Sequence, residues 1–427
     1  MKRTIKLAVV AALALGATSA FATNGSTLIG IGAKTRGMGG TSIGVGHGAE
    51  SAIANPALIT TVKGNNEISF GGTLFLPDVK VQANTTAIAG PAGVGAEQTS
   101  DSDIAVIPSV SLVSKVNDNF YMGIGMWGTG GLGVDYRDDT LNSTFSMVTA
   151  LQTMQFGVPL AYTSNGFSMG ITPIIQYSSL DIQYTQPAAF GGDDIGTGVA
   201  QDLAFGVNLG LAYEIDGLTV GAVYKSKIKF DTKDVMNTAL NGFNVGPAVG
   251  GTSINEMATP EEYGVGISYA MQGHTLAIDY KNINWEDTEG YKDFGWEDQD
   301  VLSVGYEYTT DSWAVRFGYQ YAESAVKDNI SKGLAIDATH SANMFGAMGV
   351  PVGTTSLTNT FNLLGFPGTQ ESHITLGGTY VFNETLSMDL AAIYGLENKE
   401  TFTGFTGEDI TSKHSETSYS VQLNYAF

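Results

Sequence analysis

The sequence predicts an all-β fold, a transmembrane antiparallel β-barrel of about 14 strands with an N-terminal plug, or hatch, in its lumen. Three observations predict this fold. Apolar and polar residues alternate along the chain, short and long connections alternate between the segments, and only 15% of the residues are charged. Soluble globular domains carry about 25% charged residues, so the low content favours a protein that contacts lipid.

The C-terminal segment is the clearest strand. Every second residue from Tyr419 to Phe427 is large and apolar, and the residues between them are small or polar. The segments 202–213 and 313–321 follow the same pattern. These strands are longer than the roughly 5–6 residues of soluble strands, and their aromatic residues lie near the ends, as in the girdles at membrane interfaces. Because the second face is polar, the interior is not an ordinary apolar core.

The connections alternate in length, which indicates the two ends of a barrel. Short turns contain Asn, Asp and Gly, which tolerate the positive φ of tight hairpins, and the long stretches are glycine-rich and acidic. We place the short turns and both termini on the periplasmic side and the long loops outside. The turns are 117–119, 164–166, 216–217, 272–273, 310–311 and 383–384, and the loops are roughly 80–103, 130–144, 186–200, 232–260, 285–298, 325–370 and 400–415.

The N-terminus predicts export. Lys2, Arg3 and Lys6 precede an apolar run over 7–17, and Ala20-Phe21-Ala22 supplies a small-x-small cleavage site. This is the pattern of a secretory signal peptide, and its apolar run is too short to span a bilayer as a helix. We therefore expect a signal peptide at 1–22, a hatch at 23–65 and a transmembrane barrel at 66–427.

Composition and motifs exclude several classes of function. The chain has no cysteine, which excludes disulfides and thiol chemistry, and its net charge of −22 argues against nucleic acid as a partner. None of the five histidines lies in a catalytic setting, so we expect no enzyme, no cofactor and no metal site. The run 123–128 matches G-x-G-x-x-G but lies in a strand with no helix after it. The acidic run 285–298 lacks EF-hand spacing, and we expect a solvated loop there.

The segment 23–65 precedes the first convincing strand, at 68–74, and is rich in glycine and other small residues. Its lack of bulk suits a plug packed inside a lumen, whereas a disordered periplasmic tail is the alternative. Its notable motifs are Thr23-Asn24-Gly25, the Gly-Ala-Lys-Thr-Arg-Gly-Met-Gly-Gly run at 32–40, and Ala54-Asn55-Pro56-Ala57, followed later by the glycine-rich run 125–131 and by Phe366-Pro367 before 372–377.

These motifs resemble the N-terminal signature of the FadL/TodX family, which are outer-membrane channels for long-chain fatty acids and aromatic hydrocarbons. The resemblance implies a 14-stranded barrel, a hatch whose N-terminus reaches the internal substrate site, and a third strand kinked inward to open a side gap. By this resemblance the hatch and substrate path include Thr23, Asn24, Gly25, Asn55, Pro56 and Ala57, and the kink lies near Gly128, Gly130, Gly131 and Gly133.

Several cations fall on lumen-facing positions of the expected strands, opposite aromatic and aliphatic residues. A solvated or mutually paired barrel interior explains them, and the alternative is that one of them binds a fatty-acid carboxylate. The set comprises Lys225, Lys227, Lys229, Lys281 and Arg316, with Asp279 on the same face.

An apolar segment lies within the outer loop 232–260. Exposed apolar surface often marks a binding site, and by the family resemblance this loop contributes to an outer groove that captures substrate. Packing of the loop on the lipid side is the alternative. The residues concerned are Val235, Met236, Leu240 and Phe243.

We therefore expect passive uptake of hydrophobic small molecules, long-chain fatty acids or hydrocarbons, across the outer membrane of a Gram-negative bacterium. Lateral release into the bilayer is expected at the third strand. The alternatives are a general diffusion porin, which needs no plug, and a loop-based adhesin or phage receptor. Besides the substrate, the expected partners are outer-membrane lipid, lipopolysaccharide and the barrel-assembly machinery, which would bind the C-terminal strand that ends in Phe427. We expect a monomer.

Overall fold

A computed structural model of the chain describes residues 23–84, 95–139, 143–186, 191–345 and 353–427. The expected signal peptide at 1–22 lies outside the described residues. Among the helices of the described chain, none is long and apolar enough to cross a membrane.

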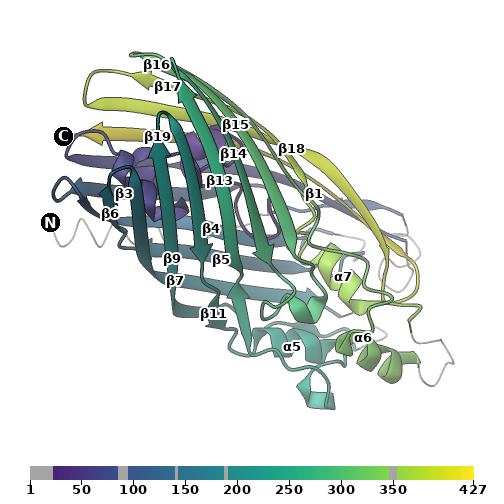
Figure 1. Cartoon of the computed structure of the whole chain (residues 1–427). Helices are drawn as coiled ribbons and strands as arrows, with labels where there is room; N and C mark the ends of the chain where they lie inside the picture. The colour runs from purple at the N-terminus through teal and green to yellow at the C-terminus, as the bar shows by residue number, and fades with distance from the viewer. Residues whose placement is uncertain (1–22, 85–94, 140–142, 187–190, 346–352) are drawn as a thin grey trace, which may run out of the picture.

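Fourteen antiparallel strands close into a barrel, as the sequence predicts (Figure 1). Closure is complete because β1 pairs with β19 from Glu67↔Ala426 to Ala83↔Ile410. The wall strands are β1 (Asn66–Ala83), β3 (Ala105–Lys115), β4 (Phe120–Asp135), β5 (Val148–Gly157) continued by β6 (Leu160–Ser164), β7 (Phe167–Thr185), β9 (Ala200–Ile215), β10 (Leu218–Lys225), β13 (Glu261–Met271), β14 (His274–Asn284), β15 (Gln299–Thr309), β16 (Trp313–Ala322), β17 (Ser372–Val381), β18 (Leu386–Thr403) and β19 (Asp409–Ala426).

The six expected tight turns join strands as predicted, and the φ angles explain their residues. Asn165, Asp216 and Gln272 have positive φ and are each followed by a glycine that also has positive φ. The expected loop boundaries are less accurate, because several strands extend beyond the apolar belt. The strand expected at 68–74 spans all of β1, and β4, β18 and β19 each extend into segments that we expected to be loops.

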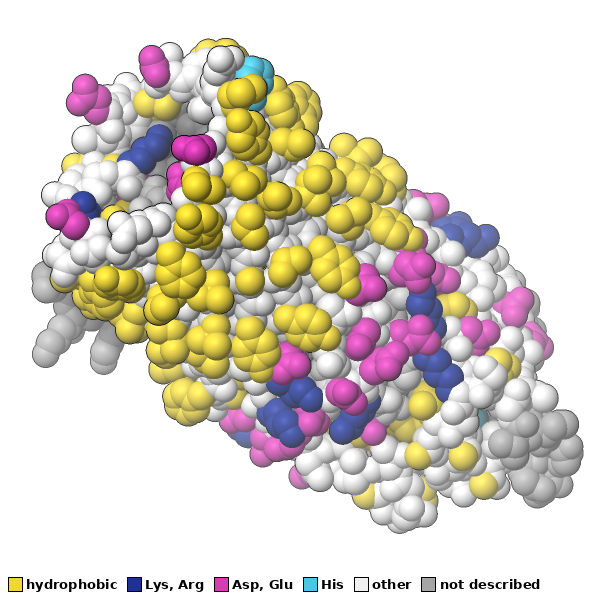
Figure 2. All heavy atoms as spheres, in the orientation of Figure 1, with side chains coloured by type: hydrophobic (Ala, Val, Ile, Leu, Met, Phe, Trp, Pro, Cys, Tyr) yellow, Lys and Arg dark blue, Asp and Glu magenta, His cyan; other side chains and the backbone are white. Residues whose placement is uncertain are grey.

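The two faces of the wall differ as a membrane barrel requires. On β19, Tyr419, Val421, Leu423 and Tyr425 are about half exposed, whereas Ser418, Ser420, Gln422 and Asn424 between them are buried in the lumen. Figure 2 shows the resulting apolar belt on the outside of the barrel, with charged side chains gathered toward the loop-bearing end. The inner face is polar because it packs against the hatch rather than against a second apolar layer.

The hatch lies inside the barrel and consists of short helical turns (Figure 1). They are α2 (Ala33–Gly37), η1 (Gly48–Glu50), α3 (Ser51–Ala54) and η2 (Pro56–Thr61). Its backbone approaches the wall so closely that only glycine fits at the contacts. A Cβ at Gly318 of β16 would overlap the backbone of Gly39, and one at Gly377 of β17 would lie 2.9 Å from the Gly37 Cα.

Polar contacts fix the hatch to the lumen. The Asp279 carboxylate on β14 accepts hydrogen bonds from the backbone nitrogens of Ser42, Ile43 and Gly44, at 2.6, 2.7 and 3.2 Å. The Arg36 guanidinium donates to Ser418 Oγ at 2.7 Å. Charge-assisted hydrogen bonds of this kind are stronger than neutral ones, so Arg36 and Asp279 are the main polar anchors of the hatch.

The outer end of the barrel carries a cap of loop helices (Figure 1). The helices are α5 (Val235–Gly242), η4 (Pro247–Val249), η5 (Lys292–Phe294), α6 (Ala335–His340), the π-helical turn η6 (Ser341–Phe345) and α7 (Leu357–Leu364). Phe243 is the centre of their core, with ring centroids 4.9 Å from Tyr184 and 5.1 Å from Phe361. Two short strands, β11 (Ile228–Asp231) and β12 (Glu256–Thr259), pair only with each other among the described residues, and β2 (Glu97–Thr99) and β8 (Asp194–Ile195) extend the wall locally.

The close approach of hatch and wall predicts a stability effect. Gly318→Ala places a methyl group against the hatch backbone at Gly39 and should lower the free energy of unfolding by about 1–3 kcal/mol, as overpacking usually does. Gly378→Ala is the matched control, because Gly378 lies on the lipid-facing side of β17, where the Cβ would meet Ala314 O at 3.3 Å and no hatch atom. Denaturant unfolding in detergent micelles measures both. An equal loss in the two variants would contradict the contact.

Candidate functional site

The wall has an opening between β3 and β4, the second and third strands of the barrel. Their pairing runs from Lys115↔Tyr121 to Ser109↔Trp127 and continues no further. Beyond this point β3 pairs, among the wall strands, only with β1, and β4 pairs only with β5. The register of the β4–β5 pairing shifts between Gly128 and Gly130. The bulge at these glycines separates β4 from β3, which is where the kink was expected. At the outer end Asp101 N donates to Asp135 O at 2.8 Å and closes the opening again.

The hatch covers this opening from inside. Thr27 forms a β-bridge with Gly130, and Gly131 N donates to Ser26 O at 3.0 Å. A Cβ at Gly130 would overlap Ser26 O, so glycine is required for the hatch backbone to pair here. Gly128 gives similar access to the Ile107 side chain of β3. Gly131 and Gly133, in contrast, continue the regular pairing of β4 with β5.

The N-terminus of the hatch lies under three aromatic side chains of the loop 285–298. The rings of Trp285, Tyr291 and Trp296 are mutually in contact, with centroids 4.6–5.2 Å apart. A Cβ at Gly25, which has φ of +60°, would meet the rings of Trp285 and Trp296. We call Trp285, Tyr291 and Trp296 the aromatic clamp.

The aromatic clamp joins the hatch to the loop cap through hydrogen bonds. Tyr291 OH lies 2.9 Å from Ser26 Oγ, and burial raises the pKa of the Tyr291 phenol, so the group stays protonated. Trp296 Nε1 donates to Asn362 Oδ1 of α7 at 3.0 Å. The expectation that 285–298 is simply a solvated acidic loop is therefore wrong for the aromatic clamp and for Phe294, all of which are buried. Among the described residues no group of three or more His, Asp or Glu side chains is placed to hold a metal ion.

A cavity lies between the hatch and the wall beside the opening. The hatch contributes aliphatic side chains to its lining. Thr27 and Thr129 also line it, and because Thr27 pairs with Gly130 at the opening, the cavity lies directly behind the covered opening. The polar part of the lining is concentrated on β10, β13 and β14. The apolar lining includes Leu28, Ile29, Ile31, Ile43, Ile53, Val223 and Ile228, and the polar lining includes Gln155, Asn208, Lys225, Glu262, Asp279 and Lys281.

Two lysines in the cavity share one carboxylate. Lys225 Nζ lies 3.1 Å from Glu262 Oε2 and Lys281 Nζ lies 3.6 Å from the same oxygen. The nearby Asp279 carboxylate already accepts three hydrogen bonds from the hatch backbone. The two ammonium groups therefore share Glu262, with Asp279 as a further carboxylate near Lys281, and they line the same cavity as the aliphatic side chains of the hatch.

The other expected cations lie elsewhere. Arg316 is at the periplasmic end, where it forms ion pairs with Glu307 at 2.6 Å and with Asp389 at 3.5 Å. It lines a separate, polar cavity. Lys227 Nζ donates to Asp287 O at 2.5 Å and lies 3.4 Å from Glu289, so it belongs to the outer loops.

Lys229 was placed on the wrong face. Ile228 and Phe230 are buried, whereas Lys229 is about half exposed. The cause is an interruption after Lys225, where Ser226 N donates to Val207 O and Val207 N donates to Ser226 Oγ. This break shifts the alternation by one residue, and a shift of one residue exchanges the two faces of a strand.

Two further groups of expected site residues have different roles. Asn55, Pro56 and Ala57 hold the hatch to β7 and β9 rather than lining the cavity, and Asn55 Nδ2 donates to Ile43 O at 2.8 Å. The side chains expected to form an exposed outer groove are buried instead, because they make the apolar core of the loop cap. They are Val235, Met236, Leu240 and Phe243.

Comparison with known proteins identifies the family. The family model described as outer membrane protein transport protein (OMPP1/FadL/TodX) matches residues 7–336. The chain belongs to this family. Its FadL/TodX membership confirms an outer-membrane transport protein of Gram-negative bacteria rather than an enzyme.

Individual FadL/TodX relatives match over most of their length. The long-chain fatty acid transport protein of Escherichia coli O6:H1 is 25% identical, with 91% of this chain and 92% of that protein covered. Outer membrane protein P1 of Haemophilus influenzae is 23% identical, over 91% and 93%. Among solved structures, a FadL homologue of Pseudomonas aeruginosa has a TM-score of 0.70 at 15% identity, covering 94% and 100%. The Pseudomonas putida toluene transporter TodX has 0.64 at 18%, over 94% and 99%. Both structures share the barrel fold.

Proposed function

We propose that this protein takes up long-chain fatty acids passively across the outer membrane and releases them sideways into the bilayer. The observation that supports this most is the cavity, which combines aliphatic hatch side chains with the Lys225–Glu262–Lys281 group and lies directly behind the β3–β4 opening. Curated relatives that match most of the chain are named long-chain fatty acid transport proteins.

The lining of the cavity suits an amphipathic acid. Its aliphatic side chains would contact the hydrocarbon tail, and the ammonium groups of Lys225 and Lys281 would bind the carboxylate in competition with Glu262. A neutral hydrocarbon is the second candidate, because the solved relatives include toluene transporters and the apolar lining alone would bind it. Only the acid makes use of the lysines.

The proposed path needs one movable segment. Thr27 lines the cavity and also pairs with Gly130, so residues 23–30 separate the substrate from the opening. Residues 23–29 are held by neutral hydrogen bonds, such as Asn24 Nδ2 to Gln320 Oε1 at 2.8 Å. The charged side chains of Arg36 and Asp279 hold the hatch from Gly30 onward, where Arg36 donates to Gly30 O at 3.1 Å. Thermal displacement of such a segment requires no external energy, which agrees with passive transport.

The alternative functions fit less well. A general diffusion porin needs an open aqueous lumen, and here residues 23–65 occupy it. An adhesin or phage receptor would use the loop cap and is compatible with transport. We further propose that the protein is a monomer and that the barrel-assembly machinery binds β19 together with Phe427, which follows it and pairs with Asn66 through two 2.9 Å hydrogen bonds.

The lysine pair predicts a selective loss of affinity. Lys225→Gln or Lys281→Gln should weaken oleate binding by on the order of 10-fold, because each removes one charge-assisted contact while the other lysine still compensates Glu262. Binding of toluene should not change. Lys229→Gln is the matched control, since this lysine lies three residues beyond the break at Ser226 and points outward. Titration calorimetry in detergent measures all three, and unchanged oleate affinity in both lumen variants would exclude the carboxylate site.

The lateral path predicts that a covalent closure stops transport. A Cβ at Gly128 lies 3.8 Å from the Ile107 Cα, so Ile107→Cys with Gly128→Cys can form a disulfide across the opening. The chain has no other cysteine. Oxidation should reduce oleate uptake to background in a host without its own transporter, and a reductant should restore it.

The control for this closure is Leu112→Cys with Ile124→Cys, which links the same two strands where they already pair. This variant should transport equally well when oxidised and when reduced. Wild-type uptake by the oxidised Ile107–Gly128 pair would contradict lateral release at this opening.

A further inference from the structure

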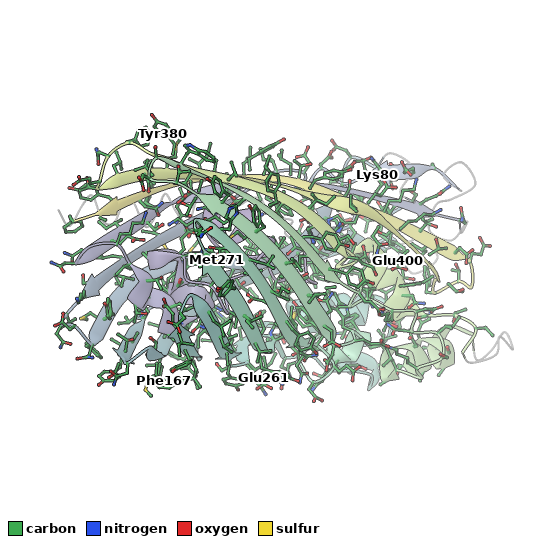
Figure 3. The ribbon with its side chains drawn as sticks, turned by 45° about the horizontal axis from the view of Figure 1, so that its top comes forward. Lys80, Phe167, Glu261, Met271, Tyr380 and Glu400 are labelled. Atoms are coloured by element: carbon green, nitrogen blue, oxygen red, sulfur yellow. The ribbon has the colours of Figure 1, made fainter. Side chains whose placement is uncertain are left out.

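Three lysines form a row on the outside of the barrel, away from the cavity and the β3–β4 opening. Lys80 of β1 pairs in register with Lys413 of β19, and Lys413 pairs with Lys399 of β18. The neighbours of Lys80 and Lys413 in sequence, Val79, Val81, Ser412 and His414, are buried, so these lysines project outward. Lys399 is exposed. Figure 3 labels Lys80 in the loop-bearing half of the barrel. We call Lys80, Lys399 and Lys413 the lysine row.

The depth of the lysine row matches the head groups of the outer leaflet. Leu76 of β1 pairs with Thr417 of β19, and Thr417 pairs with the half-exposed Tyr394 of β18. Along β1 and β19 the lysine row lies four residues beyond this level. A rise of about 3.4 Å per residue and a strand tilt of roughly 45° place the row about 10 Å farther out than this apolar level. The head-group region begins at the hydrocarbon edge and extends about 5–7 Å beyond it.

The row is electrostatically unusual. Like charges on directly opposed residues destabilise a sheet, and here three ammonium groups occupy one row, with the carboxylates of Asp78, Glu97 and Glu397 nearby. Lys80 pairs with Asp78 at 2.7 Å and Lys413 pairs with Glu97 at 2.6 Å, both partly exposed to solvent. Exposed ion pairs of this kind contribute little stability and exchange readily for another anion. Lys399 has no ion pair among the described residues.

The other lysines at this rim differ from the row. Lys227 and Lys229 both contact Glu289, and Lys233 donates to the Gln201 carbonyl. They link loops to strands within the protein, whereas the lysine row lies on one continuous, hydrogen-bonded surface of three strands. That surface is also continuous with the apolar belt, so one ligand can contact both.

We propose that the lysine row binds the phosphorylated head group of an outer-leaflet glycolipid. The acyl chains would lie along the belt beside Tyr394 and Leu396, and a phosphate would bind between Lys399 and Lys413. Charge complementarity supports this occupant, because a phosphate presents several strong acceptor oxygens to adjacent ammonium groups. The site would fix lipid to the barrel at the closing β1–β19 seam.

Native mass spectrometry of the full chain in neutral detergent tests this proposal, with bisphosphorylated lipid A as the probe. Near an anionic membrane each lysine contributes about fivefold in affinity, so replacing all three lysines of the row by glutamine should weaken binding on the order of 100-fold. Lys399→Gln alone should weaken it about fivefold without breaking an ion pair. Heat-modified migration on gels confirms that each variant is folded.

Matched controls distinguish binding at the lysine row from a general effect of positive charge at the rim. The variant with Lys227, Lys229 and Lys233 replaced by glutamine removes the same charge from the same rim and should keep wild-type affinity. Dephosphorylated lipid A should bind all proteins equally weakly, and binding of the phosphorylated lipid should persist in EDTA. Equal losses in the two triple variants, or wild-type affinity in the lysine-row variant, would overturn the proposal. So would loss of binding in EDTA, which would assign the contact to a divalent ion held by carboxylates.

Discussion

The structure depends on one constraint: backbone N–H and C=O groups at membrane depth must be hydrogen-bonded, because the bilayer core offers no partner. Thirteen of the fourteen pairs of neighbouring wall strands meet this constraint by pairing along the apolar belt, including the closing pair β1–β19. The contact between β3 and β4 does not, since it ends at Ser109↔Trp127. There the hatch supplies the missing partner, with Ser26 O accepting from Gly131 N. The hatch is therefore part of the wall as well as a plug.

This dual role connects three regions that are distant in sequence. Residues 23–30 contact the aromatic clamp of the outer loop, line the cavity and pair with the glycines of β4. A displacement of this segment changes the loop cap, the cavity and the wall opening together. The rest of the hatch is held by two charged anchors. Arg36 of the hatch donates to Ser418 of the wall, and Asp279 of the wall accepts from Ser42 N of the hatch. In the proposed mechanism, release of the N-terminus alone would open the path while the rest of the hatch stays in the lumen.

The fold could be predicted from the sequence because its determinants are local. Alternation in the segment 419–427 and the Asn, Asp and Gly turns depend only on neighbouring residues, and both were correct. The site depends on tertiary contacts and was predicted only in part. Gly128 and Gly130 were identified through the family resemblance. Lys225 and Lys281 were identified because the alternation of faces along each strand places them toward the lumen.

The errors have specific physical causes. The break at Ser226 shifts the alternation, so Lys229 faces outward although Lys225 faces the cavity. Val235 and Phe243 are buried in the core of the loop cap, where Phe243 contacts Phe361 of a loop helix more than 100 residues away, which no local pattern reveals. The aromatic clamp was missed because Trp285 and Trp296 lie within an acidic run. Their signal was the repeated Trp-Glu-Asp motif at 285–287 and 296–298.

Conductance across a planar lipid bilayer tests most directly whether residues 23–30 close both the lumen and the wall. The intact protein should show no large steady conductance, because the hatch fills the barrel and covers the opening. A mature chain that lacks residues 23–30 but retains the anchors at Arg36 and Asp279 should show a small, steady increase. A large open pore in the intact protein, or no change on removal of the segment, would contradict a hatch that serves as the missing part of the wall.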